Sequence, residues 1–150
     1  MCTLSPVKST TLVTIVLAVV AALALPATGA SRSDAAPSQI VDTWSRTVTT
    51  ADARRRGQVA TGPWRFELKS SGAMSLYSGT SKRAVVTGRL TTGANGTLRM
   101  VDMRVTGGGR CTKPATYRWQ MSGGRLVLST TGKDECGGRA AVLVGTWRRT

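Results

Sequence analysis

From Gly62 onward, short runs of alternating apolar and polar residues follow one another, and residues that favour turns separate nearly every pair of runs. In the first run Trp64, Phe66 and Leu68 alternate with charged side chains, which is the period of a half-buried strand. With a β-branched run before it and further runs after it, the pattern predicts eight strands. They are expected at residues 40–48, 64–69, 73–77, 83–91, 98–105, 116–121, 125–129 and 139–148.

The connections between these runs are mostly short enough for hairpins, so the strands are expected to form one antiparallel meander. Eight strands bury their edges best by closing into a barrel, whose interior holds side chains or one small ligand. We therefore predict an all-β fold, an eight-stranded antiparallel up-and-down barrel. A β-sandwich is the alternative, but the hairpin-length turns count against its Greek-key crossovers.

Local departures from the pattern are also predicted. Asn95-Gly96 suits a tight hairpin turn, because both residues accept positive φ. Gly88 lies inside an expected strand and indicates a bend or bulge. The apolar phase shifts between Met100 and Val101, which indicates another bulge.

Residues 50–57 interrupt the strands with one or two predicted helical turns. Thr49 or Thr50 would cap the helix, Asp52 lies in its first turn, and Gly57 ends it. Because the segment is too short for a core helix, we expect it to cover one end of the barrel.

The N-terminus carries an apolar run of about fourteen residues, 12–25, which follows Lys8 and precedes small residues ending at Ala30. This is the pattern of a secretory signal at residues 1–30, and the run falls short of the ~20 residues that cross a bilayer. The protein is therefore expected to be secreted, with an uncleaved membrane anchor as the alternative. Residues 31–39 are predicted to form a flexible leader, and 40–150 a single barrel domain.

Cys111 and Cys136 are the cysteines expected to remain after signal cleavage, since Cys2 leaves with the signal. Export and an even count favour a disulfide between them, worth about 3 kcal/mol from loop closure. Two free buried thiols or half a metal site are the alternatives. The chain has no histidine and no C-x-x-C motif, so no metal site and no cofactor are expected.

The formal net charge is +14, from 21 cations that divide into sixteen arginines and five lysines. The arginines are scattered through the expected strands, which is typical of a solvated outer face. Such a field favours weak electrostatic association with an anionic cell-wall polymer or a membrane surface. Aromatic and arginine side chains together can stack on single-stranded nucleic acid, but an exported chain is not expected to meet it.

Catalytic signatures are thin. Without histidine there is no serine or cysteine triad. Asp134 and Glu135 are adjacent and point to opposite sides in an extended segment, so they do not make an acid/base pair. Asp134 is interpreted as a structural partner of Arg139, and the protein is expected not to be an enzyme.

A tryptophan early in the first expected strand, in Val41-Asp42-Thr43-Trp44, precedes the meander, and basic residues lie at the last strand. Together these features resemble the lipocalin-like, calycin-type barrels, and the Cys111–Arg149 tail resembles small secreted bacterial proteins of unassigned function. The resemblance implies Gly-x-Trp in the first strand, where Asp42 replaces the glycine. It also implies a late arginine packed over the indole. Arg139, Arg148 and Arg149 are the candidates for that cation.

The leading functional prediction is a monomeric barrel that binds a small apolar or amphipathic ligand among the apolar faces of successive strands. The alternative is a cationic protein- or polymer-binding module, an inhibitor or wall-associated factor, whose barrel is fully packed. Trp44 and Trp147 are assigned structural roles. The predicted pocket residues are Trp64, Phe66, Leu76, Met100, Trp119 and Leu128.

Overall fold

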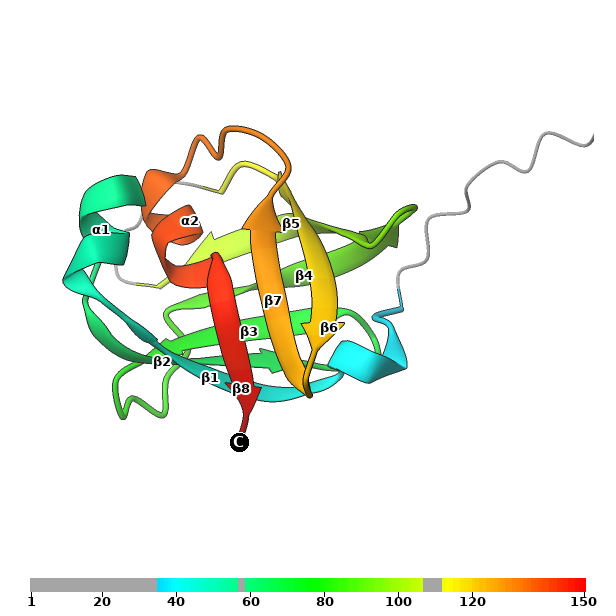
Figure 1. The fold of residues 1–150 in the computed structure, drawn as a ribbon, viewed down its shortest axis with the longest axis horizontal. Coiled ribbons are helices and arrows are strands. Elements are labelled where there is room, and N and C mark those ends of the chain that lie inside the picture. The colour runs from blue at the N-terminus through cyan, green and yellow to red at the C-terminus, as the bar shows by residue number, and fades with distance from the viewer. Residues whose placement is uncertain (1–34, 57–58, 107–111) are drawn as a thin grey trace, which may run out of the picture.

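In a computed structural model of the chain, residues 35–56, 59–106 and 112–150 are described. Eight antiparallel strands form one closed barrel, in which each strand pairs with its neighbours in sequence and the last closes on the first (Figure 1). The predicted meander and its closure are therefore confirmed. The strands are β1 (Asp42–Val48), β2 (Gly62–Leu68), β3 (Ala73–Ser78), β4 (Val86–Gly93), β5 (Thr97–Val105), β6 (Ala115–Ser122), β7 (Arg125–Thr130) and β8 (Gly145–Arg149).

Three short helices accompany the strands. The 3-10 helix η1 (Ser38–Ile40) precedes β1, so the first strand begins two residues later than predicted. Helix α1 (Thr50–Arg56) occupies the predicted helical segment, and it lies beside α2 (Gly137–Leu143) at one end of the barrel (Figure 1). The C-terminus lies at the opposite end.

The strand predicted at 139–148 is wrong in its first half, where the chain forms helix α2, and β8 begins only at Gly145. The α2 residues Ala140, Ala141, Val142 and Leu143 are consecutive and all buried, an arrangement that fits a helix inserted into a barrel mouth. A short apolar run satisfies the helical and the extended period equally well, so the sequence pattern did not separate the two.

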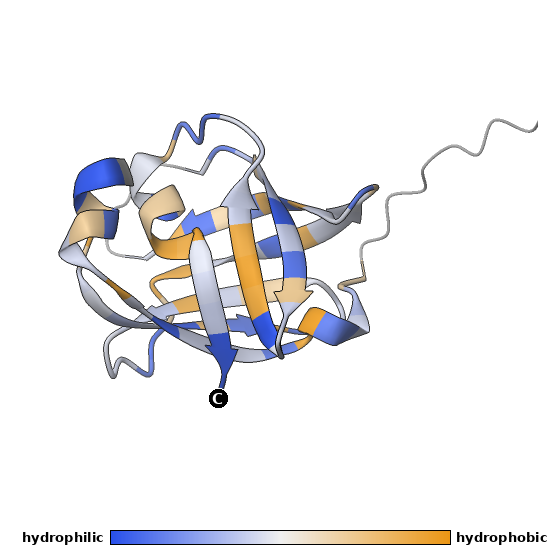
Figure 2. Cartoon of the chain, viewed as in Figure 1, coloured by the Kyte–Doolittle hydropathy of each residue, from blue (hydrophilic) through white to orange (hydrophobic). Residues whose placement is uncertain are grey.

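The barrel interior is filled by apolar side chains that alternate along the strands. Val142 and Leu143 of α2 complete the core from one end, and the rings of Phe66 and Trp147 lie 5.7 Å apart. Figure 2 shows the apolar residues of β7 and α2 as orange and tan segments. The largest fully buried side chains are those of Trp44, Trp147, Tyr117, Phe66, Ile40, Leu68, Met74, Leu76, Leu90, Leu98, Met100 and Leu126.

The predicted turn and the predicted irregularity of β4 are both present. Asn95 and Gly96 have φ values of 60° and 66° and form the turn between β4 and β5. The register between these strands shifts at Gly88, where a Cβ atom would lie 2.6 Å from the sulfur of the buried Met103. On β5 the irregularity lies slightly later than predicted, at the exposed Asp102, whose φ is 52°.

Candidate functional site

The junction between β1 and β8 is the shortest stretch of pairing in the closed barrel. The two strands are in register at Trp44 with Arg149 and at Ser45 with Arg148. On its other side, β1 pairs with β2 along its whole length, from Asp42 to Val48. Beyond Ser45, β1 and β8 are therefore no longer paired, and side-chain contacts replace backbone pairing between them.

Arg46 fills this gap from the inner phase of β1. Its Nη1 donates hydrogen bonds to the carbonyl oxygens of Val142, at 2.8 Å, and Val144, at the C-terminal end of α2. These carbonyls lie where a helix leaves acceptors without partners inside the helix, so the guanidinium stabilises the helix end. Gly145, with φ of 138°, leaves room for it, because a Cβ atom there would lie 2.8 Å from the guanidinium.

Asp52 holds the other side of the Arg46 guanidinium, with 3.0 Å between Asp52 Oδ2 and Arg46 Nη2. Thr49 caps α1: its Oγ1 accepts from the Asp52 amide at 3.2 Å, and its own amide and hydroxyl donate back to Asp52 Oδ2. Burial raises the pKa of Asp52, but the Thr49 hydrogen bonds and the charges of Arg46 and Arg55 outweigh it and lower the pKa below its ordinary value.

A second polar cluster anchors the N-terminal end of α2. Arg139 bonds Asp134 with two nitrogens, at 2.6 and 2.9 Å, and donates to the Lys113 carbonyl at 2.6 Å. The Tyr117 hydroxyl and the Cys136 amide also donate to Asp134. Burial raises the pKa of Asp134, yet the hydrogen bonds from Arg139, Tyr117 and Cys136 lower it overall. Burial and the Asp134 carboxylate both raise the pKa of Tyr117.

Trp44 and Trp147 occupy equivalent places on the two strands of the junction. Each is the third residue of its strand and donates its indole N–H, at 2.9 Å, to the carbonyl four residues earlier. The Arg149 guanidinium lies 5.2 Å from the Trp44 ring, and the Arg46 guanidinium 5.8 Å from the Trp147 ring. Of the three arginines that the resemblance left open, Arg149 is therefore the one that covers the first-strand indole, while Asp42 pairs with it at 2.7 Å.

The predicted pocket residues lie inside the barrel, and none of them lines the hollows found among the described residues. Trp64, Phe66, Leu76, Met100 and Leu128 are buried members of the core, and Trp119 is partly buried against it. Those hollows are open to solvent and lie at the surface of the barrel.

The largest of these hollows, of about 640 Å³, lies on the outer face over the β1–β8 junction. We call it the junction hollow. Arg46 and Asp52 lie at its α1 end, with Thr49 and Pro63 beside them. Across the strands it is lined by Ser45, Thr47, Arg125, Thr146 and Arg148.

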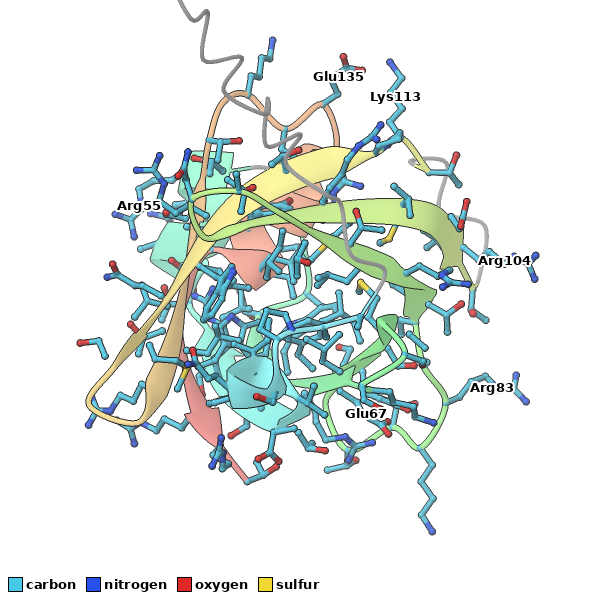
Figure 3. All side chains as sticks on the ribbon, turned by 90° about the vertical axis from the view of Figure 1, so that its right-hand side faces the viewer. Arg55, Glu67, Arg83, Arg104, Lys113 and Glu135 are labelled. Carbon is cyan, nitrogen blue, oxygen red and sulfur yellow. The ribbon has the colours of Figure 1, made fainter. Side chains whose placement is uncertain are left out.

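Exposed arginines recur on the outer face of the barrel, and four of them, on β5, β6 and β8, have cross-strand neighbours that carry hydroxyls. The register pairs are Arg104 with Thr87, Arg99 with Thr91 and Thr116, Arg118 with Thr97 and Ser129, and Arg148 with Ser45. Figure 3 shows Arg83 and Arg104 projecting into solvent. The ion pairs of the described residues use carboxylates at strand ends, in loops and in α1, together with Glu67 on β2.

Arg46 was missed at the sequence level, although a signal was present. It lies between Trp44 and Val48 on the apolar phase of β1, where a charged residue needs a buried partner. No such signal places Arg125 beside the junction hollow, because its position there depends on the register of β7 with β8.

Other expected features are limited by what the structure describes. Cys136 is buried at the start of α2, whereas Cys111 and the 1–30 signal lie outside the described residues, so the disulfide and the export signal stay predictions. Within 35–56, 59–106 and 112–150 there is no group of three or more potential metal ligands. None of the helices in these segments has the length and apolar character needed to span a bilayer.

Comparison with known proteins gives no relative from which a function could be transferred. No family model, no curated protein and no solved structure matches the chain. The site must therefore be interpreted from its own geometry.

Proposed function

We propose that the protein is an exported, non-catalytic binding module that associates with an anionic polymer through the outer face of its barrel. The observation that carries this proposal is the placement of exposed arginines on β5, β6 and β8 beside hydroxyl side chains of the neighbouring strands. Guanidinium and hydroxyl groups are the donors that phosphate, sulfate and carboxylate oxygens accept. The net charge of +14 would draw such a polymer to the surface.

The packing of the interior favours this function over an apolar-ligand site. Five of the six predicted pocket residues are buried in one continuous core, into which α2 also inserts Leu143. A fluorescent apolar probe tests the alternative directly. We expect no saturable binding, and stoichiometric uptake that is lost on Phe66→Ala would restore the ligand-binding interpretation.

We also infer that the barrel is of the calycin type. Support comes from the first-strand Trp44 and from the late Arg149 that lies over its ring. Export, a cleaved signal at residues 1–30 and a monomeric state belong to the same proposal, and N-terminal sequencing of the exported protein tests the cleavage.

The polymer proposal is tested by the salt dependence of retention. The purified protein is applied to immobilised polyphosphate, to immobilised polygalacturonate and to an uncharged dextran resin at a series of salt concentrations. We expect retention on the two anionic resins with an affinity that falls linearly in log–log form as salt rises. Equal behaviour on dextran and on the anionic resins at low salt would reject the proposal.

A further inference from the structure

We propose that the junction hollow is a specific site for an oxyanion carried on a polyol or sugar chain. This inference deepens the polymer-binding function above, since it names one site and the chemistry of its ligand. It rests on the separation of β1 and β8 beyond Ser45, which leaves a hollow lined by arginines and hydroxyls.

The two exposed arginines of the hollow are neighbours on adjacent strands. Leu126 on β7 is in register with Trp147 on β8, so Arg125 and Arg148 lie one position further along and face the same side. In the described parts of the chain neither lies within ion-pair distance of a carboxylate. Like charges directly across a strand pair are destabilising, whereas a bound anion between them reverses the sign of the interaction.

The remaining lining supplies neutral donors and acceptors. Ser45, Thr47 and Thr146 bring three hydroxyl groups from the two sides of the junction. The one carboxylate, Asp52, is bonded to Arg46 and Arg55, so it leaves the charge of Arg125 and Arg148 uncompensated. A hydroxyl-rich lining beside two guanidinium groups suits a ligand with both hydroxyls and an oxyanion.

The size of the hollow indicates more than a free ion. A volume of about 640 Å³ lies within the usual range for small-molecule sites, and it far exceeds that of one phosphate or sulfate. We therefore assign the site to one oxyanion together with the flanking polyol or sugar units of a chain. A phosphodiester and a sugar carboxylate share this chemistry.

The first test is a titration of the ¹⁵N-labelled protein with glycerol 3-phosphate at constant ionic strength. We expect saturable shifts at the amides of Ser45, Thr47, Thr146 and Arg148. Shifts spread evenly over the outer arginines would overturn the site. This measurement needs no variant, so it decides the question even if a substitution prevents folding.

The second test compares two double variants that remove the same charge. Arg125→Gln/Arg148→Gln changes the hollow, and Lys82→Gln/Arg83→Gln changes two exposed cations of the β3–β4 loop, of which Arg83 projects into solvent (Figure 3). We expect at least about tenfold weaker binding of polyphosphate or polygalacturonate oligomers for the first and less than about twofold for the second. Equal weakening by both pairs would reject the site, and the oligomer that binds more tightly identifies the phosphodiester or the carboxylate as the source.

The outcomes separate this inference from the broader proposal. Retention on anionic resins with equal weakening by both variants leaves the polymer function and removes the site. If glycerol 3-phosphate changes the amide chemical shifts of the hollow but the protein is not retained on any anionic resin, the site stands and the polymer function is rejected.

Discussion

Two arginine–aspartate pairs hold the two ends of α2, and they differ in how far they are shielded from water. In the Asp134–Arg139 pair both side chains are nearly inaccessible, at 3% and 8% relative exposure. In the Arg46–Asp52 pair the arginine is 7% exposed and the aspartate 16%, and both line the junction hollow. The first pair serves the fold alone, whereas the second both closes the barrel and borders a surface that a ligand can reach.

The difference also lies in how many elements each pair joins. Asp134 and Arg139 are five residues apart, and Tyr117 of β6 adds a third group. Arg46 instead connects β1, α1 and the carbonyls that end α2. The second pair thus replaces strand pairing that the β1–β8 junction lacks beyond Ser45.

The largest effect is expected for Asp134→Ala. The substitution leaves the Arg139 guanidinium buried without its carboxylate and removes the acceptor of the Tyr117 hydroxyl. Removal of one member of a buried pair costs about 3–5 kcal/mol of unfolding free energy. Urea unfolding at neutral pH measures it, and Glu135→Gln, on an exposed neighbour, is the matched control. A loss below 1 kcal/mol would show that the shielding of this pair is not what stabilises α2.

A smaller loss is expected for Arg46→Ala. The variant loses donors to two carbonyls and to Asp52, but Asp52 keeps its hydrogen bonds with Thr49 and its contact with Arg55. Hydrogen bonds to charged groups are worth about 1.5–3 kcal/mol, and we expect a total loss of about 2–3 kcal/mol. Arg148→Ala, exposed on β8, should change the unfolding free energy by less than about 0.5 kcal/mol. A loss for Arg46→Ala larger than that for Asp134→Ala would reverse the comparison.

Acid tests the same two ion pairs without a change in side-chain size, because protonation removes the charge of each carboxylate and leaves its shape unchanged. The pKa values of Asp52 and Asp134 are both lowered in the folded protein, mainly by hydrogen bonds that outweigh burial. Their stabilisation is complete above the unfolded-state carboxyl pKa of about 3.9, and it is lost as the pH falls below that value through the folded-state pKa. Unfolding free energies of the wild type should therefore fall between pH 5 and pH 2, and Asp134→Asn should show a shallower fall. An unchanged slope in Asp134→Asn would mean that this carboxyl does not contribute.

The features of the two ends of α2 that depend on local sequence pattern could be predicted from the sequence. Alternation and turn residues predicted the barrel, and Asp134 was interpreted as a structural partner of Arg139. The mouth of the barrel could not be predicted in the same way. Ala140–Leu143 fits a helix or a strand, and the carbonyl partners of Arg46 lie about a hundred residues away, at Val142 and Val144. Only the register of β1 with β8 brings them together.

The smallest expected effect concerns the helix that carries Asp52. Thr49 is the N-cap of α1, and its hydroxyl both accepts from the Asp52 amide and donates to the Asp52 carboxylate. Thr49→Ala should cost about 1 kcal/mol, the usual value of a cap. Thr50→Ala, one residue later and exposed, is the matched control and should be close to neutral, because alanine also favours the helix. If the two substitutions cost the same, Asp52 is held by Arg46 and Arg55 and not by the cap, and the second pair resembles the first more closely than its exposure indicates.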